Sequence, residues 1–591
     1  MKKTLIEFAV STLKKYDINE EFIFTKSGDK YSGITRLELY NGALNLYNYI
    51  VKSGLKPGDR IAIISENRIE WVMADFACMF AKMVTVPIYT TLSSESIKYI
   101  LNDAEVKLCF VSNALQLDKV LAIKNEVPSL KTIISFNDTT KTSGIEIITI
   151  TSILRQGRTF EADKLIHRIE EINEKLDENE VITIIYTSGT TGTPKGVMLT
   201  HKNIYSNLIS CNKILLVSEV DVFLSYLPYS HIFERTTGYY FPLFNGPKIY
   251  YAQSIDTIGI QMAEVKPTFV ITVPRLLDKM YNRLIKMYEE MPPGLKKRIF
   301  GWGLNTARIE GLSKSSLKWQ LADRLVFRKI KEKTGGRLRY FISGGGALNK
   351  TVGKFFNGLG IEALEGYGMT ETSPVISANR PGKIKYGTVG PPLDGVSVKI
   401  AADGEILVKG DLVMKGYYNN PEETESTIID GWMHTGDIGE IDSDGYIKIT
   451  DRKKSLFKSS GGKYIAPTHI EELILQIPYV DQVLVIGNER MYVTALIVPE
   501  IEGLKLLSRK LKLNVETESE LFHSEALLKH INSDINEKQK NLAPHEKIRK
   551  FTLIEKPFSI ENGEITPSLK IKRKFVEEKY GYLIERMYHK V

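Results

Sequence analysis

The segment from Tyr186 to Gly196, YTSGTTGTPKG, has the residue types needed to hold phosphate groups. Gly189 and Gly192 allow backbone N–H groups to approach oxygens closely, the hydroxyls donate hydrogen bonds, and Lys195 adds a positive charge. The segment follows the strand-like run VITIIY and precedes apolar residues at helical spacing, so a strand–loop–helix is expected. It differs from the common nucleotide loop GxxxxGK[ST], because its lysine follows a proline and precedes a glycine. The predicted phosphate-binding residues are Thr187, Ser188, Gly189, Thr190, Thr191, Gly192 and Lys195.

Five further segments follow in order along the chain. They are Gly344-Gly345-Gly346 in SGGGAL, Tyr367–Glu371 (YGMTE), Thr435-Gly436-Asp437, Ile449–Arg452 (ITDR) and Pro567–Arg573 (PSLKIKR). Together with the first segment they resemble the adenylate-forming superfamily, which includes acyl-CoA synthetases, luciferases and amino-acid-adenylating domains. One such segment alone is weak evidence, whereas six in the family's order, spread over most of the chain, are specific.

The resemblance implies how a nucleotide is held. The three glycines of SGGGAL correspond to the adenine side, and Tyr367 can present its ring face to adenine because glycines flank it. Asp437 accepts hydrogen bonds from both ribose hydroxyls, and Arg452 donates to the same sugar. Without the motifs, a core tyrosine and a turn-forming aspartate would be equally good interpretations. The nucleotide-binding set therefore also includes Gly344, Gly345, Gly346, Gly366, Tyr367, Gly368, Thr370, Asp437, Arg452 and Lys570.

The implied reaction requires positive charge around the phosphates. An anionic carboxylate must attack the α-phosphate of ATP, so like charges oppose the approach. Lys195, Lys570 and a magnesium ion held by Thr190 and Glu371 would offset that repulsion in the transition state. Lys195, Glu371 and Lys570 are thus the predicted catalytic residues. In the family the lysine near the C-terminus follows Ser-Gly; here a leucine replaces that glycine, so Lys572 stays open as an alternative to Lys570.

The second half-reaction of the family transfers the acyl group to a thiol. The resemblance implies that a small C-terminal domain rotates between the two steps about a hinge, which corresponds to Lys454. The rotation would bring Gly461 and Gly462 toward the pantetheine of coenzyme A. A glycine pair permits close backbone approach, although a simple turn explains these two glycines equally well.

The acid that is activated is suggested by two regions. The segment Leu227–Arg235, LPYSHIFER, resembles the family's acyl-pocket signature, and His231 is expected to shape that pocket rather than to act as a general base. The mostly helical, basic stretch from Met280 to Arg339 resembles long-chain fatty acyl-CoA synthetases. Its cations fit either a solvated helical face or peripheral contact with anionic lipid. We therefore expect ligation of a long-chain fatty acid to coenzyme A; an acyl-carrier-protein synthetase, or activation of another acid, is the alternative.

The elements that position these residues alternate between strands and helices from about residue 60 to residue 370. This alternation predicts an α/β fold with layered parallel sheets covered by helices. Hairpin signals near Asp403-Gly404 and Asp444-Gly445 predict a small β-rich subdomain at about 385–451. We expect an AMP-binding N-terminal domain over 1–451 and a mobile α+β C-terminal domain over 452–591 that carries the catalytic lysine.

Composition limits the class of protein. The net charge is +8 and apolar residues make up 43%, which are ordinary globular values that exclude disordered and fibrous classes. Three cysteines without CxxC spacing, and no convincing signal peptide or membrane span, predict a cytoplasmic protein. No GxGxxG follows a strand and no GxSxG elbow occurs, which disfavours hydride transfer and hydrolysis. The expected ligands are ATP, magnesium, coenzyme A and a fatty acid, with no nucleic acid; the oligomeric state is not indicated.

Overall fold

The chain divides into two compact units. The computed structural model describes residues 2–141, 144–188, 194–309, 311–453, 455–461, 463–513, 515, 517–566 and 570–589. The first unit comprises Met1–Lys399, Leu407–His434 and Asp442–Ile447, and the second comprises Ile400–Ile406, Thr435–Ile441 and Lys448–Val591. The predicted domain division at residue 451 stays a prediction.

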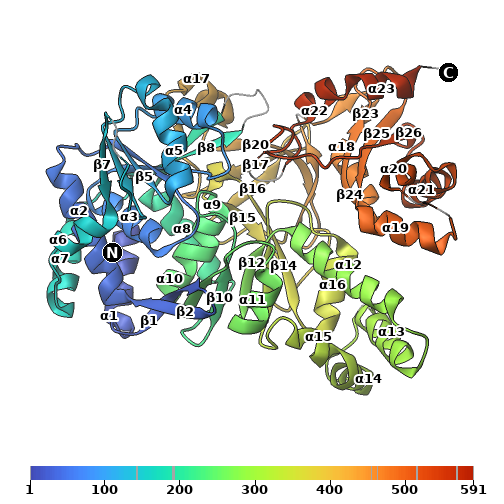
Figure 1. The fold of residues 1–591 in the computed structure, drawn as a ribbon, viewed down its shortest axis with the longest axis horizontal. Coiled ribbons are helices and arrows are strands. Elements are labelled where there is room, and N and C mark those ends of the chain that lie inside the picture. The colour runs from blue at the N-terminus through green and yellow to red at the C-terminus, as the bar shows by residue number, and fades with distance from the viewer. Residues whose placement is uncertain are drawn as a thin grey trace. The chain divides into compact units, whose positions relative to one another are not determined.

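An eight-stranded sheet forms one half of the first unit (Figure 1). Its order is β18 (Gly416–Tyr417), β9 (Pro194–Thr200), β8 (Val181–Ser188), β4 (Val84–Ile88), β3 (Arg60–Ile64), β5 (Leu108–Val111), β6 (Thr132–Ser135) and β7 (Glu146–Thr149). The strands from β8 to β7 are parallel, whereas β9 and β18 join as antiparallel neighbours.

A second eight-stranded sheet forms the other half. Its order is β15 (Val375–Ala378), β14 (Glu362–Gly368), β13 (Tyr340–Ser343), β12 (Phe269–Thr272), β10 (Val222–Ser225), β11 (Lys248–Tyr251), β1 (Glu21–Ser27) and β2 (Lys30–Thr35). The strands from β14 to β1 are parallel, and only the outermost β15 and β2 are antiparallel to their neighbours. The predicted layered parallel sheets are confirmed.

Both sheets are buried on both faces, because apolar side chains point alternately to opposite sides of each strand. In β3, Ile61 and Ile63 join the core between the sheets, whereas Ala62 and Ile64 join the outer core of the first sheet. The inner core is built with α1 (Leu5–Lys15), α2 (Arg36–Lys52), α3 (Ile69–Phe80), α6 (Ile150–Gln156), α7 (Ala162–Glu174), α8 (His201–Asn212), α9 (Ile232–Glu234) and α10 (Phe241–Asn245). The outer helices of the first sheet are α4 (Ser94–Asp103) and α5 (Ala114–Ile123).

The outer face of the second sheet is covered by the helices of the basic stretch and their neighbours. They are α11 (Ile258–Val265), α12 (Pro274–Glu290), α13 (Leu295–Ala307), α14 (Leu317–Ala322), a π-helical segment Asp323–Phe327, α15 (Arg328–Glu332) and α16 (Lys350–Leu359). Among the helices in the described part of the chain, none combines the length and the apolar character needed to cross a membrane.

The predicted β-rich subdomain is present as a five-stranded sheet. Its order is β16 (Ser397–Ile400), β17 (Glu405–Lys409), β20 (Trp432–Ile441) and β19 (Ile428–Ile429), with β21 (Ile447–Arg452) paired to β20. Tight turns join β16 to β17 and β20 to β21, where Gly404 and Gly445 have φ of +85° and +81°. Such left-handed backbone favours glycine, which explains why the hairpin signals were readable in the sequence.

The second unit contains a smaller α+β body. Its strands are β22 (Phe457–Lys458) paired with β23 (Tyr464–Ile465), and a sheet of β24 (Val480–Ile486), β25 (Val493–Pro499) and β26 (Ile548–Leu553). Its helices are α18 (Pro467–Ile474), α19 (Ile501–Lys510), α20 (Glu518–His523), α21 (Glu525–Lys538), α22 (Arg573–Lys579) and α23 (Gly581–Tyr588). The predicted α+β character of the C-terminal part is confirmed.

Candidate functional site

Two paired strands, β8 and β9, flank the predicted phosphate loop, so the helix expected after the loop is present as α8 but follows a strand that the prediction omitted. Residues 189–193, which include Gly189, Thr190, Thr191 and Gly192, lie outside the described residues. The chain resumes in β9, which pairs antiparallel with β8 through Thr187↔Lys195 and Ser188↔Pro194. α8 begins only at His201, because Thr200 and Asn203 form a reciprocal capping box there. That capping signal was readable in the sequence, and it places the start of the helix at His201, seven residues past the loop's proline.

Lys195 lies against two residues that the motif analysis did not select. Its Nζ forms an ion pair with Glu423 and lies 5.5 Å from the ring centroid of Tyr417. Tyr417 is on β18, which pairs with β9, and Glu423 is in the first turn of α17 (Pro421–Thr427). A local signal did exist for that helix, since Asn420 caps it and a proline follows. Nothing local in the sequence indicated that the helix would deliver a carboxylate to this lysine.

Glu371 is brought to the same place through Tyr417. It is buried in the short 3-10 helix Thr370–Thr372, next to the half-buried Thr370. The Tyr417 hydroxyl donates to Glu371 Oε1 at 2.9 Å. Burial, assisted by the Glu371 charge, raises the pKa of Tyr417, so the phenol keeps its proton and remains a donor. Tyr417 therefore touches both predicted catalytic residues of the first unit.

The Glu371 carboxylate suits a magnesium ion that also binds nucleotide phosphates. Within the described ranges, no group of three His, Cys, Asp or Glu side chains could hold a metal by itself. Magnesium is usually bound through one or two carboxylates together with substrate phosphates rather than by an all-protein cage. The single buried carboxylate of Glu371, which contacts Lys195's neighbour Tyr417, fits that pattern. The second predicted ligand, Thr190, lies outside the described residues.

A largely apolar cavity is lined by residues of β10, β12, β13 and β14 and reaches the carboxyl ends of β13 and β14. The connections leave β10 and β12 in opposite directions, and ligands of open α/β sheets bind at such switch points. Most of its lining is aliphatic or aromatic, and the rest is mainly glycine. The lining residues are Cys211, Ile214, Leu215, Phe223, His231, Ile232, Phe233, Thr237, Phe241, Phe269, Ile271, Ile342, Gly344, Gly345, Leu364, Gly366, Tyr367, Gly368, Met369, Pro374, Val375, Ala378, Asn379 and Leu393. Predicted nucleotide residues and the predicted acyl-pocket residue thus share one cavity wall.

Glycines keep this wall thin. A Cβ on Gly344 would lie 2.8 Å from the Phe233 ring, so any side chain there would displace that ring. A Cβ on Gly368 would lie 1.9 Å from the Pro374 carbonyl oxygen, which excludes a side chain. Gly346, although part of the predicted segment, is absent from the lining and lies near Pro274 at the start of α12.

His231 lines the cavity from the start of α9. Its Nδ1 accepts a hydrogen bond from the Phe233 N–H at 3.1 Å, so this ring nitrogen acts as a helix cap. The geometry fixes the imidazole at the cavity wall. This is the arrangement expected of a residue that shapes the pocket.

The loop that carries His231 is anchored by the turn after β3. The Asn67 amide donates to Leu227 O at 2.7 Å and to Ser225 Oγ at 3.1 Å, and its Oδ1 accepts from the Tyr229 N–H at 2.9 Å. One side chain that follows a strand of the first sheet therefore holds the predicted acyl-pocket loop, which follows a strand of the second sheet. Polar residues directly after a buried strand were the available signal, but no spacing linked Asn67 to residue 227.

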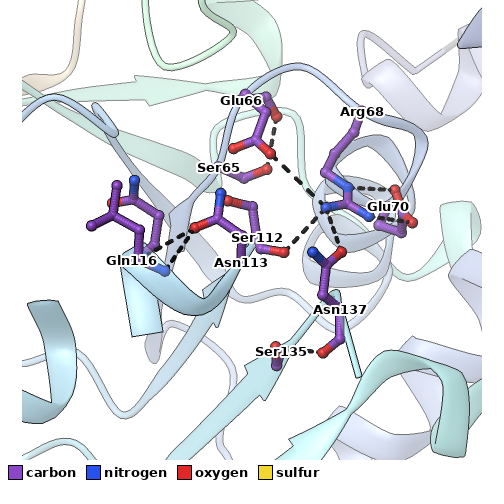
Figure 2. A network of polar contacts seen from close by, with 10 residues as sticks. Ser65, Glu66, Arg68, Glu70, Ser112, Asn113, Gln116, Ser135 and Asn137 are labelled. Atoms are coloured by element: carbon purple, nitrogen blue, oxygen red, sulfur yellow. Dashed lines mark hydrogen bonds and ion pairs between the residues drawn. The ribbon is translucent and has the colours of Figure 1, made fainter. Parts of the chain in front are cut away.

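A polar network holds that turn in place, as Figure 2 shows. Arg68 donates from Nε and Nη2 to the Glu70 carboxylate at 2.8 Å each, and from Nη1 to Asn137 Oδ1 at 3.0 Å. The same Nη1 reaches Ser112 O at 3.1 Å. Because these groups stand at the carboxyl ends of β3, β5 and β6, the network joins three neighbouring strand ends into one rigid edge.

Two buried carboxyl groups hold the segment that follows His231. Arg235 lies in the π-helical segment Arg235–Tyr240 and pairs with Asp75 of α3, both fully buried. Tyr240 donates to the same aspartate at 2.6 Å. Burial raises the pKa of Asp75, and the Arg235 charge offsets part of that rise. Glu234 accepts from Ser225 Oγ at 2.6 Å, and its complete burial raises its pKa to about 8, so its protonated form is favoured at neutral pH.

The predicted ribose residues lie in the second unit. Arg452 Nε is 3.3 Å from Asp437 Oδ1; the aspartate is buried and the arginine is exposed. The Asp437 N–H donates to Thr435 Oγ1 at 3.1 Å, and Gly436 between them has φ of +71°. The pair is preorganised by a turn, which agrees with both the ribose and the turn-forming interpretation.

Lys570 also lies in the second unit and is exposed. Two hydrogen bonds, of 2.8 Å and 3.1 Å, join its backbone to Thr566. Lys572 is exposed as well, so exposure does not choose between the two lysines. Gly461 lies in the exposed turn between β22 and β23. The predicted hinge Lys454, the partner glycine Gly462 and residues 567–569 lie outside the described residues.

Comparison with known proteins identifies relatives along the whole chain. A family model described as AMP-binding enzyme matches residues 13–418, and one described as AMP-binding enzyme C-terminal domain matches residues 455–591. The long-chain-fatty-acid–CoA ligase FadD15 of Mycobacterium bovis is 33% identical over 92% of this chain and 90% of the relative. Long chain acyl-CoA synthetase 6, peroxisomal, of Arabidopsis thaliana is 34% identical over 94% and 82%. Long-chain-fatty-acid–CoA ligase 5 of Rattus norvegicus is 33% identical over 100% and 89%.

Two solved structures illustrate the fold. The adenylation domain of a carboxylate reductase from Mycobacterium chelonae has a TM-score of 0.77 at 22% identity, covering 99% of this chain and 91% of that one. ATP-bound MatB from Rhodopseudomonas palustris has a TM-score of 0.70 at 24% identity, covering 98% and 99%. At these identities the likeness concerns the fold.

Proposed function

We propose that this chain, which belongs to the AMP-binding enzyme family, joins a long-chain fatty acid to coenzyme A with ATP through an acyl-adenylate. The observation that carries the proposal is the shared wall of the cavity. An apolar hollow is bounded by His231 and by the glycine and tyrosine segments of the nucleotide motifs, and Glu371 follows directly along the chain. An acid whose tail fills the hollow would present its carboxylate where ATP is expected.

In the first half-reaction a carboxylate oxygen bonds to the α-phosphorus, and the bond from that phosphorus to the bridging oxygen of pyrophosphate breaks. Lys195 is placed to neutralise phosphate charge, because nucleotide oxygens can take the place of the Glu423 carboxylate that it pairs with. Tyr417 orients the Glu371 carboxylate that would hold magnesium. When bound, magnesium would neutralise phosphate charge there.

In the second half-reaction the thiol sulfur bonds to the acyl carbon, the bond from that carbon to AMP breaks, and the thiol proton is released. We propose that Lys570 acts on the phosphates in the first step only, that the glycines at 461 and 462 face the pantetheine in the second, and that the chain pivots near Lys454 between them. The domains over 1–451 and 452–591 are part of this proposal. Asp437 and Arg452 would hold the ribose.

The acceptor and the acid are tested together. We expect ATP–pyrophosphate exchange, measured with acids from acetate to oleate, to be greatest with long-chain acids. AMP release should then require coenzyme A. AMP release that required the pantetheine of a carrier protein, and not coenzyme A, would support the alternative acceptor. Exchange that is greatest with short or aromatic acids would contradict the long-chain assignment. No exchange with any acid would contradict the chemistry itself.

We also propose that the enzyme meets such acids by peripheral contact with a membrane. Long-chain acids are amphiphilic and partition into lipid, since each buried CH₂ contributes about 0.8 kcal/mol. An enzyme that stays near a lipid surface samples more of its substrate.

A further inference from the structure

The positive charge of the chain is concentrated in the helices that cover the second sheet. Residues 295–333 contain 11 Lys and Arg against 3 Asp and Glu, which leaves 68 of each sign in the rest of the chain. The net charge of +8 therefore equals the charge of this segment alone. Such concentration on one surface attracts an anionic partner far more than the same charge spread over the molecule.

One face of α13 combines apolar and cationic side chains and is mostly exposed, although its half-buried Trp302 also packs against the outer core of the second sheet. Leu295, Arg298, Trp302 and Asn305 follow at spacings of three and four residues, so they share one side of the helix, and Ile309 follows shortly after the helix ends at Ala307. Leu295 is 72% exposed and Ile309 is 40% exposed. The opposite side includes Leu304 and Ala307, which are buried in that core.

The exposed face of α13 borders a hollow of about 520 Å³ shared with α12 and α14. Its lining includes Tyr288, Arg298, Trp302, Asn305, Ile309 and Lys318. In the part of the chain that the structure describes, neither Arg298 nor Lys318 has an ion-pair partner, although both line the hollow. Two cations beside an indole ring form a site for an anionic headgroup at an apolar boundary.

A stripe of leucines continues this surface along α14 and the π-helical segment after it. Leu317, Leu321 and Leu325 follow at intervals of four residues and are 86%, 51% and 39% exposed. Lys318 and Arg324 flank the stripe and are exposed. Large leucine side chains exposed in series on one helical face mark a surface that meets an apolar partner.

We propose that this surface, which we call the basic apolar face (Leu295, Arg298, Trp302, Ile309, Leu317, Lys318, Leu321, Arg324 and Leu325), docks on a bilayer that contains anionic lipid. The leucines would enter the interface and the cations would bind phosphate headgroups. A nucleic acid would use the cations but would leave the leucine stripe in water, so a bilayer fits both features. This inference rests on the proposed function, because it gives the surface that would keep the enzyme near its acid.

The fold connects the basic apolar face to the cavity through one helix. α12 begins directly after Val273, which lies 3.8 Å from the position of a Cβ on the cavity residue Gly345. Its last turns include Tyr288, which lines the hollow. A helix of 17 residues is about 25 Å long. α12 through α15 lie together at the lower right of Figure 1, so the proposed lipid contact stands at the far end of a helix that starts beside the acyl cavity.

Vesicle co-sedimentation of the full chain tests the proposal. We expect binding to phosphatidylcholine vesicles that contain phosphatidylglycerol, weak binding to phosphatidylcholine alone, and a decline as salt is added. Arg298→Gln with Lys318→Gln should weaken partitioning roughly five-fold per cation. Leu317→Ser with Leu321→Ser should weaken it roughly ten-fold or more. Matched controls are Lys164→Gln with Lys529→Gln, and Leu216→Ser at a leucine that is 85% exposed elsewhere; these should bind like the unsubstituted protein.

Three results would overturn the proposal. They are no vesicle binding, equal binding to neutral vesicles, and equal losses in the variants and their controls. If the unsubstituted protein were a dimer by size-exclusion chromatography without lipid, and the leucine variant were a monomer, the surface would be an interface between copies. Adenylate formation from a dissolved medium-chain acid, without vesicles, should be unchanged in all variants. If the unsubstituted protein formed no adenylate at all, the proposed function would be contradicted. If it formed adenylate but did not bind lipid, only the docking surface would be contradicted.

Discussion

The ion pair between Lys195 and Glu423 leads to a specific prediction about ATP affinity. In the structure the lysine that should meet phosphate is held by a carboxylate, which a nucleotide must displace. Glu423→Gln removes that competing charge and leaves a side chain of nearly the same shape. We therefore expect the variant to bind ATP more tightly than the unsubstituted protein.

The burial of the two side chains sets the magnitude. They are 16% and 33% exposed, so the pair is neither a surface pair, worth about 0.2–1 kcal/mol, nor a fully buried one, whose breaking costs about 3–5 kcal/mol. Because solvent screens the exposed part of the pair, the free energy by which Glu423 opposes ATP binding at Lys195 is about 1 kcal/mol. A change of this size corresponds to roughly five-fold tighter ATP binding.

Calorimetric titration of ATP with magnesium, in the absence of acid and coenzyme A, measures this affinity directly. Glu422→Gln is the matched control, because this neighbour in α17 is exposed and its replacement makes the same change in net charge. Equal affinity of Glu423→Gln and the unsubstituted protein would refute the reasoning. Equal tightening by both variants would show a long-range charge effect and not displacement of one partner.

Three further predictions concern catalysis, stability and pH. Lys570→Ala should slow adenylate formation by a factor of about 10²–10³, because it removes one preorganised charge contact, while thioester formation from supplied acyl-adenylate should stay nearly intact. Rapid-quench assays of each half-reaction measure both rates. Lys572→Ala is the matched control. Asp75→Asn leaves the Arg235 charge buried without its partner, so the free energy of unfolding in urea should fall by about 3–5 kcal/mol. Glu234 has a folded pKa of about 8 against an ordinary 4.5, so the folded state holds a proton that the unfolded state releases between those values. Its contribution to stability should therefore fall by up to about 1.4 kcal/mol per pH unit as pH rises through that window, and Glu234→Gln should abolish this dependence in urea unfolding from about pH 6 to about pH 8.

Each of these predictions has a contradicting outcome. Equal loss in both half-reactions would make Lys570 structural, and loss only in Lys572→Ala would transfer its role. A double variant Asp75→Asn with Arg235→Met should recover part of the lost stability; a further loss would mean that packing, and not the unpaired charge, explains the effect. A parallel pH dependence in Glu234→Gln and the unsubstituted protein would assign the titration to another group.

Local sequence signals determined the elements and the order of the nucleotide segments. The strands at Arg60–Ile64 and Phe269–Thr272 are short apolar runs with turn residues around them, and their burial on both faces follows from that composition. The turns at Gly404 and Gly445 were readable because left-handed backbone favours glycine within a few residues of sequence. A local error was the omission of β9 between the phosphate loop and the predicted helix, whose start is marked by the capping box at Thr200.

The tertiary structure alone decided which distant side chains share the site. Tyr417 contacts Glu371 across 46 residues, Glu423 pairs with Lys195 across 228, and Asn67 holds the predicted acyl-pocket loop across 160. These contacts depend on the order of strands within two sheets, and β18 reaches β9 only because a late segment returns to the edge of the first sheet. Periodicity and spacing carry no information about such returns, since loop closure over hundreds of residues leaves no local pattern. The sequence therefore determined the chemical groups, and the sheet order decided their partners.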